Sequence, residues 1–566
     1  MSNWESKSVS DTINDIFENV LVLPVIQRRL VWAEDKMELL FDTLLKGESF
    51  GGIMTIQEEA NFEPLFAFRY FTKDGKPQSS FSKIKLERNH NLVIDGQQRL
   101  QSFYIGLTGS INRKILYFDL FSDFKNMEFD FEFENDESKL PKKNQDRNED
   151  AFKETKWISI PSLFMRLKET NNEDQVADEI IKRLNIINEK QKEHVARNIR
   201  TFYKNVFSSK HVGLARVTIN RALDPVANRQ RVVELFIRLN DGGTKLSSFD
   251  LVASKLKGYE WGMEEFLDKI LKDYTDIGIT QDTLIKLVFI LSDNQSKEMS
   301  NIEQEDATFA INNNKRIAET LKALKMFLIA AKLYDYYKNE NRSFIPLYFV
   351  AYHIFNKSIP DDQLKDIFVT YDTTNTDYRN LYKWMYLSLL SGVFKSKGAG
   401  WIPYKTGIKK ILGKIKNFKG KDFPIKELFD VYRLHPVYFY DTFEESNLNS
   451  LEKTFLFYIL YDREAITRSQ DIDHIHPISL LENKYDYQFI HIVENYQLLD
   501  PGTNRGIKNN KPLKEWIKNF VQNKNLYIKR HLIPENEDLW EIENYTDFLS
   551  ERRGLIIHKI NSILSI

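Results

Sequence analysis

The chain has 566 residues, more than one hydrophobic core usually organises, so we expect about two to four domains. Its formal net charge is −1 although 28% of its residues are charged, so no global field indicates a nucleic-acid partner and any basic surface must be local. The chain contains no cysteine, which excludes disulfides, thiolate catalysis and cysteine-ligated zinc. The polar, acidic N-terminus is unlike a signal peptide, and the apolar stretch 381–394 is too short to cross a bilayer. These features predict a cytoplasmic protein without a membrane segment.

The first part of the chain predicts mixed α and β structure. Residues 34–46 carry apolar side chains at helical spacing, and Gly47 follows as a stop. Short apolar or alternating runs predict strands at 53–56, 91–94, 115–120 and 129–134, the last as an edge strand. From about 151 to 460 helical patterns dominate, as in 317–337, and the last hundred or so residues return to short strands and helices.

The stretch LVIDGQQRLQSF, residues 92–103, places a polar turn between a strand and a helix. We expect Asp95 to cap this helix and Gly96 to let another backbone segment approach closely. The apolar residues that follow at helical spacing should turn the two glutamines and Arg99 away from the core. A helix N-terminus attracts anions, and a guanidinium can fork onto a phosphate. The alternative is purely structural, with Arg99 in an ion pair and the glutamines solvated.

A second polar cluster, residues 471–516, contains the pair Asp473-His474, then Asn495 before an apolar strand, and then Asn504. This order is that of the ββα-metal, or HNH, nuclease finger, in which a hairpin and one helix converge on a metal ion. Cleaving a phosphodiester needs an activated water and a cation that neutralises charge on the phosphate. Histidine suits the base, and carboxylate and amide oxygens suit Mg²⁺ or Mn²⁺.

We therefore expect His474 to be the general base and Asp473 and Asn504 to be metal ligands, while Asn495 braces the hairpin through backbone groups. The competing interpretation makes Asp-His a helix-cap pair and the asparagines turn residues. His476 suits a structural role at least as well as ligation, and His491 suits a structural role better than a catalytic one.

Two basic segments break the overall neutrality. Residues 395–421 contain nine lysines and no acidic residue, which fits a solvated face as well as a binding surface. Residues 504–530 contain eight basic residues and the single Glu515, and they adjoin the nuclease-like motif. We therefore expect Arg505, Lys508 and Lys511 to contact DNA phosphates.

Residues from about 440 to 560 resemble the HNH domain of RNA-guided CRISPR effectors at DxDHIxP and NRGxK. They resemble more closely the C-terminal nuclease domain of the GmrSD group of modification-dependent restriction proteins. Three N-terminal motifs resemble the GmrS-like domain, related to the ParB/sulfiredoxin fold, over roughly 10–260. These are PVIQRRLVW at 24–32, DGQQR at 95–99, and LFIRLNDGGTKLSSFDL at 235–251, which contains Arg238, Asn240, Gly242 and Gly243.

The resemblance implies an α+β multidomain fold with three parts: a ParB/sulfiredoxin-like α/β domain over 1–260, a helical connecting region over 261–435, and an HNH (ββα-metal) domain over 436–566. It implies a nucleotide site for GTP, ATP or another nucleoside triphosphate at Asp95, Gly96, Gln97, Gln98, Arg99, Gln27 and Arg28. Many relatives have an aromatic residue where this chain has Ile26, so the preferred DNA modification could differ. A P-loop motif is absent, so hydrolysis would use other groups.

The resemblance predicts a restriction endonuclease of phage defence in which a nucleotide-hydrolysing sensor regulates a metal-dependent nuclease. Its partner would be double-stranded DNA carrying phosphorothioate, or glucosylated or hydroxymethylated cytosine, and it could act as a homodimer. Two alternatives stay open at this stage: a nucleotide-gated DNA-binding switch with a non-cleaving HNH clamp, and a nuclease toxin that senses no modification.

Overall fold

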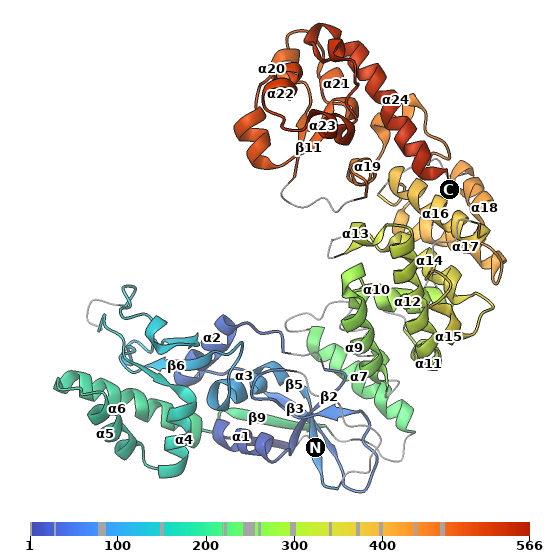
Figure 1. Cartoon of the computed structure of the whole chain (residues 1–566). Helices are drawn as coiled ribbons and strands as arrows, with labels where there is room; N and C mark the ends of the chain where they lie inside the picture. Colours follow the sequence, from blue (N-terminus) through green and yellow to red (C-terminus); the bar gives the residue numbers. More distant parts are fainter. Residues whose placement is uncertain are drawn as a thin grey trace. The chain divides into compact units, whose positions relative to one another are not determined.

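The computed structural model describes most of the chain, and Figure 1 shows its helices and strands. The described residues are 3–27, 30–76, 87–147, 152–217, 219, 224–241, 255–258, 262–294, 302–338, 342–369, 374–395, 400–434, 439–463 and 470–565. They form two compact units, the first made of Met1–Glu265 with Met299–Thr308 and the second of Phe266–Glu298 with Phe309–Ile566. None of the described helices is long and apolar enough to cross a membrane.

The first unit is built on a mixed sheet whose strand order is β1-β9-β3-β5-β2-β4. Its strands are β1 (Asn3–Lys7), β2 (Leu21–Pro24), β3 (Ile53–Glu58), β4 (Phe68–Arg69), β5 (His90–Asp95) and β9 (Val212–Val217). The pairs β2/β5 and β3/β9 are parallel and the other pairs are antiparallel. Strands from both ends of the unit's sequence therefore meet in one sheet, with β5 near its middle.

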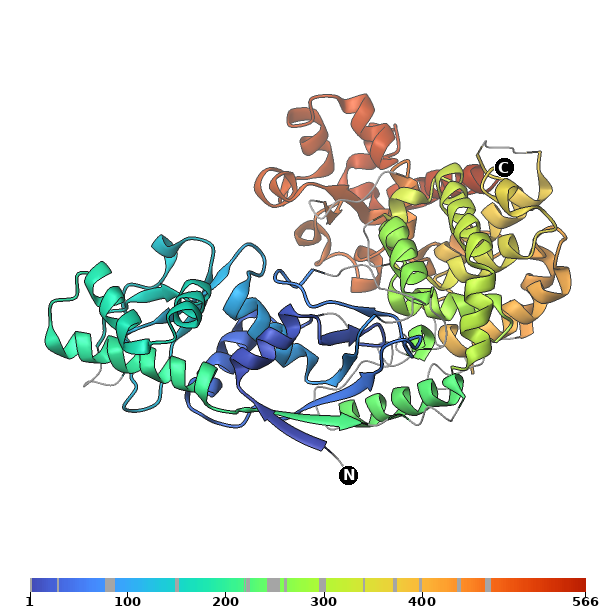
Figure 2. The same ribbon diagram turned by 90° about the horizontal axis from the view of Figure 1, so that it is seen from below.

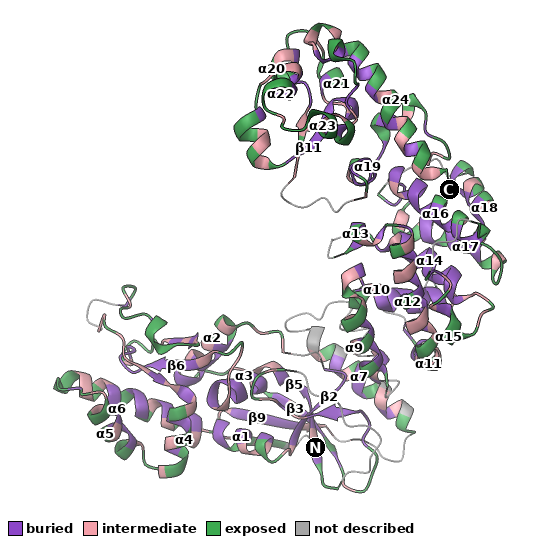
Figure 3. Cartoon of the chain, viewed as in Figure 1, coloured by how far each residue is buried: buried purple, intermediate pink, exposed green. Residues whose placement is uncertain are grey.

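Side chains alternate between the two faces of the sheet along each strand, and both faces are covered by a hydrophobic core. Leu21, Leu23 and Val93 join one core, which includes α1 (Val9–Phe17), α2 (Glu34–Leu45) and α3 (Gln97–Thr108). Their neighbours Val22, Leu92 and Ile94 join a second core together with Val232, Val233 and Phe236 of α7 (Pro225–Asp241). Figure 3 shows these strands as almost wholly buried. This two-sided burial explains why the strands are continuous apolar runs.

A smaller lobe of the first unit follows α3. Its sheet has the order β7-β6-β8, with β6 (Ile115–Asp119), β7 (Phe131–Glu134) and β8 (Trp157–Ser159). Helices α4 (Ile160–Thr170), α5 (Glu173–Arg183) and α6 (Glu189–Tyr203) complete it. Figures 1 and 2 show α5 and α6 at the end of this unit away from α7.

The second unit is largely helical before a short hairpin. Its longer helices are α9 (Met263–Tyr274, which starts in the first unit), α10 (Gln281–Leu291), α12 (Asn314–Ala330), α14 (Ile345–Phe355), α16 (Thr376–Leu390), α17 (Ile408–Ile415), α18 (Ile425–Leu434) and α19 (Lys453–Leu460). Helix α14 is buried from Pro346 to Phe355, so it is the central helix of this bundle.

The hairpin pairs β10 (Asp471–His474) with β11 (Tyr496–Leu499) in antiparallel register. Around it lie α20 (Ile478–Leu481), α21 (Tyr487–Ile490), α22 (Leu513–Asn519), α23 (Lys524–His531) and α24 (Tyr545–Leu564). Their common core is rich in aromatic side chains, among them Trp516, Trp540, Tyr545 and Phe548. The unit spans both the predicted connector and the predicted nuclease region, and the division at residue 435 stays a prediction.

Several predicted elements are confirmed, including the helix at 34–46, the left-handed Gly47 after it with φ +74°, and the edge strand β7. The helical pattern over 317–337 is also confirmed, although it is divided between α12, which ends at Ala330, and α13 (Tyr334–Tyr337), with a break at Lys332, whose φ is +53°. The α+β fold class is correct.

Candidate functional site

The hairpin of the second unit sets Asp473 and His474 at the end of β10, opposite Gln497 and Tyr496 of β11. The His474 Nε2 atom lies 3.1 Å from Nδ1 of His491, and its ring packs against the Tyr496 ring at 4.9 Å. Burial and the neighbouring His491 lower the pKa of His474 to about 4, against the opposing influence of Asp473. The imidazole is therefore neutral at pH 7, the state that accepts a proton from water.

Asp473 is held by two donors on a single oxygen. Its Oδ2 accepts a hydrogen bond of 2.8 Å from Gln497 Nε2 and lies 2.8 Å from Lys508 Nζ. The Lys508 side chain has 0% exposure, and its ammonium also donates to the His474 carbonyl at 2.5 Å. Burial lowers the pKa of Lys508, while Asp473 acts in the opposite direction. The lysine thus links the strand that carries Asp473 and His474 to the wide helical turn Gly502–Lys508.

The two asparagines occupy different surroundings. Asn495 is fully buried, accepts from His476 N at 2.9 Å, and donates to the carbonyls of His476 and Ile490 at 3.2 and 3.1 Å. It therefore braces the backbone after β10, as its predicted role requires. Asn504 lies half-buried on the Gly502–Lys508 turn, and within the described residues its side-chain amide makes no hydrogen bond.

The donor chemistry fits a hard divalent cation. Both bonds to the Asp473 carboxylate among the described residues fall on Oδ2, so Oδ1 is left as a ligand, together with the amide oxygen of Asn504. Few protein oxygens and several waters are the usual coordination of Mg²⁺. The described residues contain no cluster of three His, Cys, Asp or Glu side chains arranged for a metal, so such a cation would depend on amide and water ligands.

The predicted DNA contacts need one correction. Lys508 is fully buried and bonded to Asp473, so its ammonium is out of reach of a phosphate. Arg505 is 76% exposed and forms an ion pair with Asp471 at 2.9 Å, and Lys511 is half-buried and bonds to the Ile507 carbonyl. These two remain at the surface, where a phosphate could reach them.

The DGQQR turn of the first unit differs from its predicted geometry in two ways. Asp95 does not cap α3. The N-cap is Gly96 with φ +85°, and no side chain of the described chain caps it. Gly96 does allow a close approach, because a Cβ there would lie 2.3 Å from Ile53 Cδ1 and 3.4 Å from the Gly52 carbonyl. Arg99 turns back onto the protein, donating to the Phe50 carbonyl at 2.6 Å and lying 3.4 Å from Asp95 Oδ2. Burial lowers the pKa of Arg99, and Asp95 partly offsets this.

The glutamines of this region serve the backbone. Gln97 is buried, contrary to the expectation that it faces away from the core. Gln98 Oε1 accepts from Val31 N at 2.9 Å and from Trp32 N at 3.3 Å. Gln27 is buried and donates to the Val93 and Ile94 carbonyls at 3.2 and 2.7 Å. Gln27 thus bonds to the end of β5 and Gln98 bonds to residues 31 and 32, so the motifs at 24–32 and 95–99 are in direct contact. Arg28, Gly242 and Gly243 lie outside the described residues, as does the Asn240 side chain.

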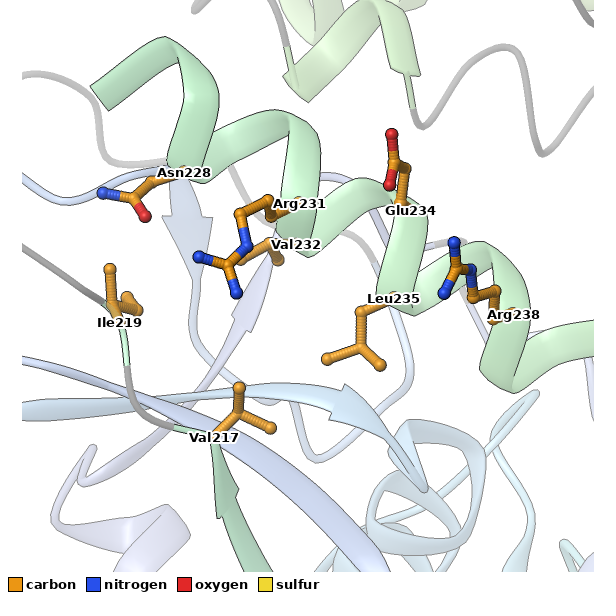
Figure 4. Close-up of a pocket in the computed structure, with 8 residues that line it drawn as sticks. All are labelled: Val217, Ile219, Asn228, Arg231, Val232, Glu234, Leu235 and Arg238. Atoms are coloured by element: carbon orange, nitrogen blue, oxygen red, sulfur yellow. The ribbon is translucent and has the colours of Figure 1, made fainter. Parts of the chain in front are cut away.

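A cavity of about 250 Å³ lies between α7 and the end of β9 in the same unit. Figure 4 shows its lining, which combines apolar and polar side chains: Val217, Ile219, Val232, Leu235, Asn228, Arg231, Glu234 and Arg238. Arg231 and Arg238 project from one helix, and both are exposed at their tips. Guanidinium groups above an apolar floor suit a flat or apolar group that carries negative charge.

Sequence reasoning identified Arg238 but missed Arg231 and Asn228. The signal was present, because positions 228, 231, 235 and 238 follow helical spacing and therefore share one face. The contact of His491 with His474 was also missed, because nothing in the local sequence FIHIV shows which ring it meets.

Two comparisons with known proteins bear on these sites. Residues 9–257 match a family model described as the N-terminal domain of the GmrSD restriction endonuclease. An uncharacterized protein from Methanocaldococcus jannaschii is 26% identical to the chain, over 99% of each sequence. The family-model match covers the DGQQR turn and the α7 cavity and ends before the β10/β11 hairpin.

Proposed function

Since the match over residues 9–257 places this chain in the GmrSD restriction endonuclease family, we propose that its hairpin unit is the nuclease and its N-terminal unit the nucleotide-responsive sensor. The observation that carries the proposal is the convergence at β10. There a neutral imidazole, a carboxylate and the turn that bears Asn504 are joined through one buried lysine.

In the proposed reaction, His474 takes a proton from the attacking water. Asp473 and Asn504 would hold Mg²⁺ or Mn²⁺, which supplies charge stabilisation at the phosphate. Asn495 holds the backbone on which His474 sits, and the exposed Arg505 and the half-buried Lys511 bind flanking phosphates.

The test of the nuclease is a plasmid-nicking assay with His474→Ala in Mg²⁺ and in Mn²⁺. We expect cleavage to fall at least about a hundred-fold, the usual contribution of general base catalysis, with DNA binding retained. His558→Ala is the matched control, because His558 is exposed on α24. Unchanged cleavage by His474→Ala would exclude this histidine as the base.

We propose that a nucleoside triphosphate binds at the DGQQR turn, with Arg99 exchanging its contact with Asp95 for a phosphate. Support comes from the uncapped N-terminus of α3, the left-handed Gly96, and the long 3.4 Å distance of the Asp95–Arg99 pair. Arg99→Ala should reduce nucleotide hydrolysis with GTP or ATP at least tenfold. Arg113→Ala, at an exposed position after α3, is its control. Normal turnover by Arg99→Ala would leave this arginine with a structural role.

We propose that the cavity under α7 takes part in recognising the modified DNA, since its apolar floor and two arginines suit a modified base or backbone group near a phosphate. The assay compares cleavage of unmodified DNA with glucosylated, hydroxymethylated and phosphorothioated DNA. Equal cleavage of all four would favour a toxin-like nuclease, and binding without cleavage of any of them would favour a clamp.

A further inference from the structure

The Lys508 ammonium occupies a position that a surface cation of a DNA-binding motif would not take. Its side chain has 0% exposure, and among the described residues its ammonium contacts the Asp473 carboxylate and the His474 carbonyl. A buried charge is stable only when it is paired and hydrogen-bonded. This lysine has both a paired carboxylate and a carbonyl acceptor.

The pairing has a consequence for any metal at Asp473. A carboxylate that faces an ammonium at 2.8 Å is already neutralised, so a divalent cation that approaches Oδ1 gains less electrostatic attraction than it would from a lone carboxylate. The ammonium and the cation also repel each other across the same carboxylate. Gln497 also donates a hydrogen bond to this oxygen but carries no charge. Removing Gln497 or Lys508 in turn therefore distinguishes the effect of a hydrogen bond on the metal from the effect of a charge.

We propose that Lys508 is a positioning residue that serves as the resident counter-ion of Asp473, holding the site together before the metal binds and setting how weakly the metal binds. The inference rests on the proposed nuclease site but not on its activity. It concerns the affinity for Mn²⁺ and the stability of the metal-free protein, both of which can be measured without DNA.

The test is a titration of the full chain with Mn²⁺ alone. Calorimetry measures the affinity for Mn²⁺, and thermal unfolding measures the shift in melting temperature that Mn²⁺ produces. In Lys508→Met the freed carboxylate should bind Mn²⁺ at least tenfold more tightly than in the wild type. Without metal, the variant should melt at a lower temperature than the wild type. Saturating Mn²⁺ should then raise the melting temperature of the variant by more degrees than it raises that of the wild type. A residue with a merely structural role would lower the melting temperature without raising metal affinity.

Three further variants make the result specific. Gln497→Leu removes a neutral bond from the same oxygen, so its Mn²⁺ affinity should stay within about threefold of the wild type. Lys508→Arg keeps the charge and should bind Mn²⁺ like the wild type. Lys508→Met combined with Asp473→Asn removes both charges, and it should melt above Lys508→Met alone while losing the response to Mn²⁺.

Equal or weaker Mn²⁺ binding by Lys508→Met overturns the inference. If this variant is unfolded without metal, Mn²⁺ should fold it as judged by circular dichroism, and failure to fold at saturating Mn²⁺ also overturns it. A separate failure, in which His474→Ala still cleaves DNA while these binding results hold, would refute the proposed base and leave the role of Lys508 intact.

Discussion

Replacement of Arg552 by methionine gives the sharpest test of how the β10/β11 hairpin is held. Arg552, on α24, is 2% exposed and donates to five backbone carbonyls, which belong to Val493, Glu494, Tyr496, His531 and Leu532. The first three flank the start of β11, and the last two end α23. One guanidinium thus joins the hairpin to two helices. Burial lowers its pKa to about 10, so it stays charged at neutral pH.

The magnitude follows from the acceptors that would lose their donor. A net loss of about 1 kcal/mol for each of the five carbonyls gives an upper figure of about 5 kcal/mol, and relaxation of the surroundings reduces it to roughly 3 kcal/mol. A loss of about 3 kcal/mol corresponds to a hundred-fold or greater rise in the population of the opened hairpin. Arg552→Lys should recover only part of this, because an ammonium has three donors and cannot span five acceptors.

The assay is hydrogen exchange with mass spectrometry on peptides that cover β10 and β11. In Arg552→Met we expect amide protection there to fall roughly a hundred-fold, while peptides of the first unit keep theirs. Arg433→Met is the control, because Arg433 is 73% exposed and its recorded contact is an ion pair of 3.7 Å. Protection within threefold of the wild type in Arg552→Met would refute the reasoning.

Two further predictions concern backbone strain and pH. Gly96→Ala should lower the free energy of unfolding of the first unit by about 2 kcal/mol in urea titrations, because its φ is +85° and its Cβ would clash with Ile53. Gly554→Ala, with open space around it on α24, should instead be neutral or slightly stabilising, and equal effects of the two would contradict the strain argument. Burial lowers the pKa of His531 to about 3, below its unfolded value, so the unfolded chain binds a proton that the folded chain does not, and stability is lost as pH falls below about 6.5. Between pH 7.5 and 5 this histidine should cost about 2 kcal/mol, and His531→Gln should remove that much of the pH dependence measured by urea unfolding.

The sequence was most informative where a pattern is local. The periodicity of 34–46 and the glycine at 47 predict α2 and its end because helix formation depends on neighbours three and four residues apart. Asn495 could be predicted as a brace because a buried amide beside a hairpin must bond backbone groups. The order of Asp473, His474, Asn495 and Asn504 likewise follows a local sequence motif.

Long-range pairing could not be predicted in the same way. The β9 strand lies in a region that the sequence assigned mainly to helices, and its partners β1 and β3 are more than a hundred residues earlier. The burial of Lys508 contradicts the general preference of lysine for the surface, and it is explained by the Asp473 carboxylate and the His474 carbonyl, which lie about 35 residues earlier in the chain. Arg99 is a similar case, since its partner at Phe50 is 49 residues distant.

Arg99 and Lys508 are alike in contacts but differ in what they can do. Each cation binds one carboxylate and one carbonyl, and from sequence each was assigned to a phosphate. The Asp95 side chain is 40% exposed and lies 3.4 Å from Arg99, a pair worth at most about 1 kcal/mol, so giving it up for the proposed triphosphate would cost little. Lys508 has no exposed surface, and releasing it would leave a buried charge unpaired, which costs several kcal/mol. The proposed nucleotide could therefore reach Arg99, whereas Lys508 acts only from within the protein, through Asp473.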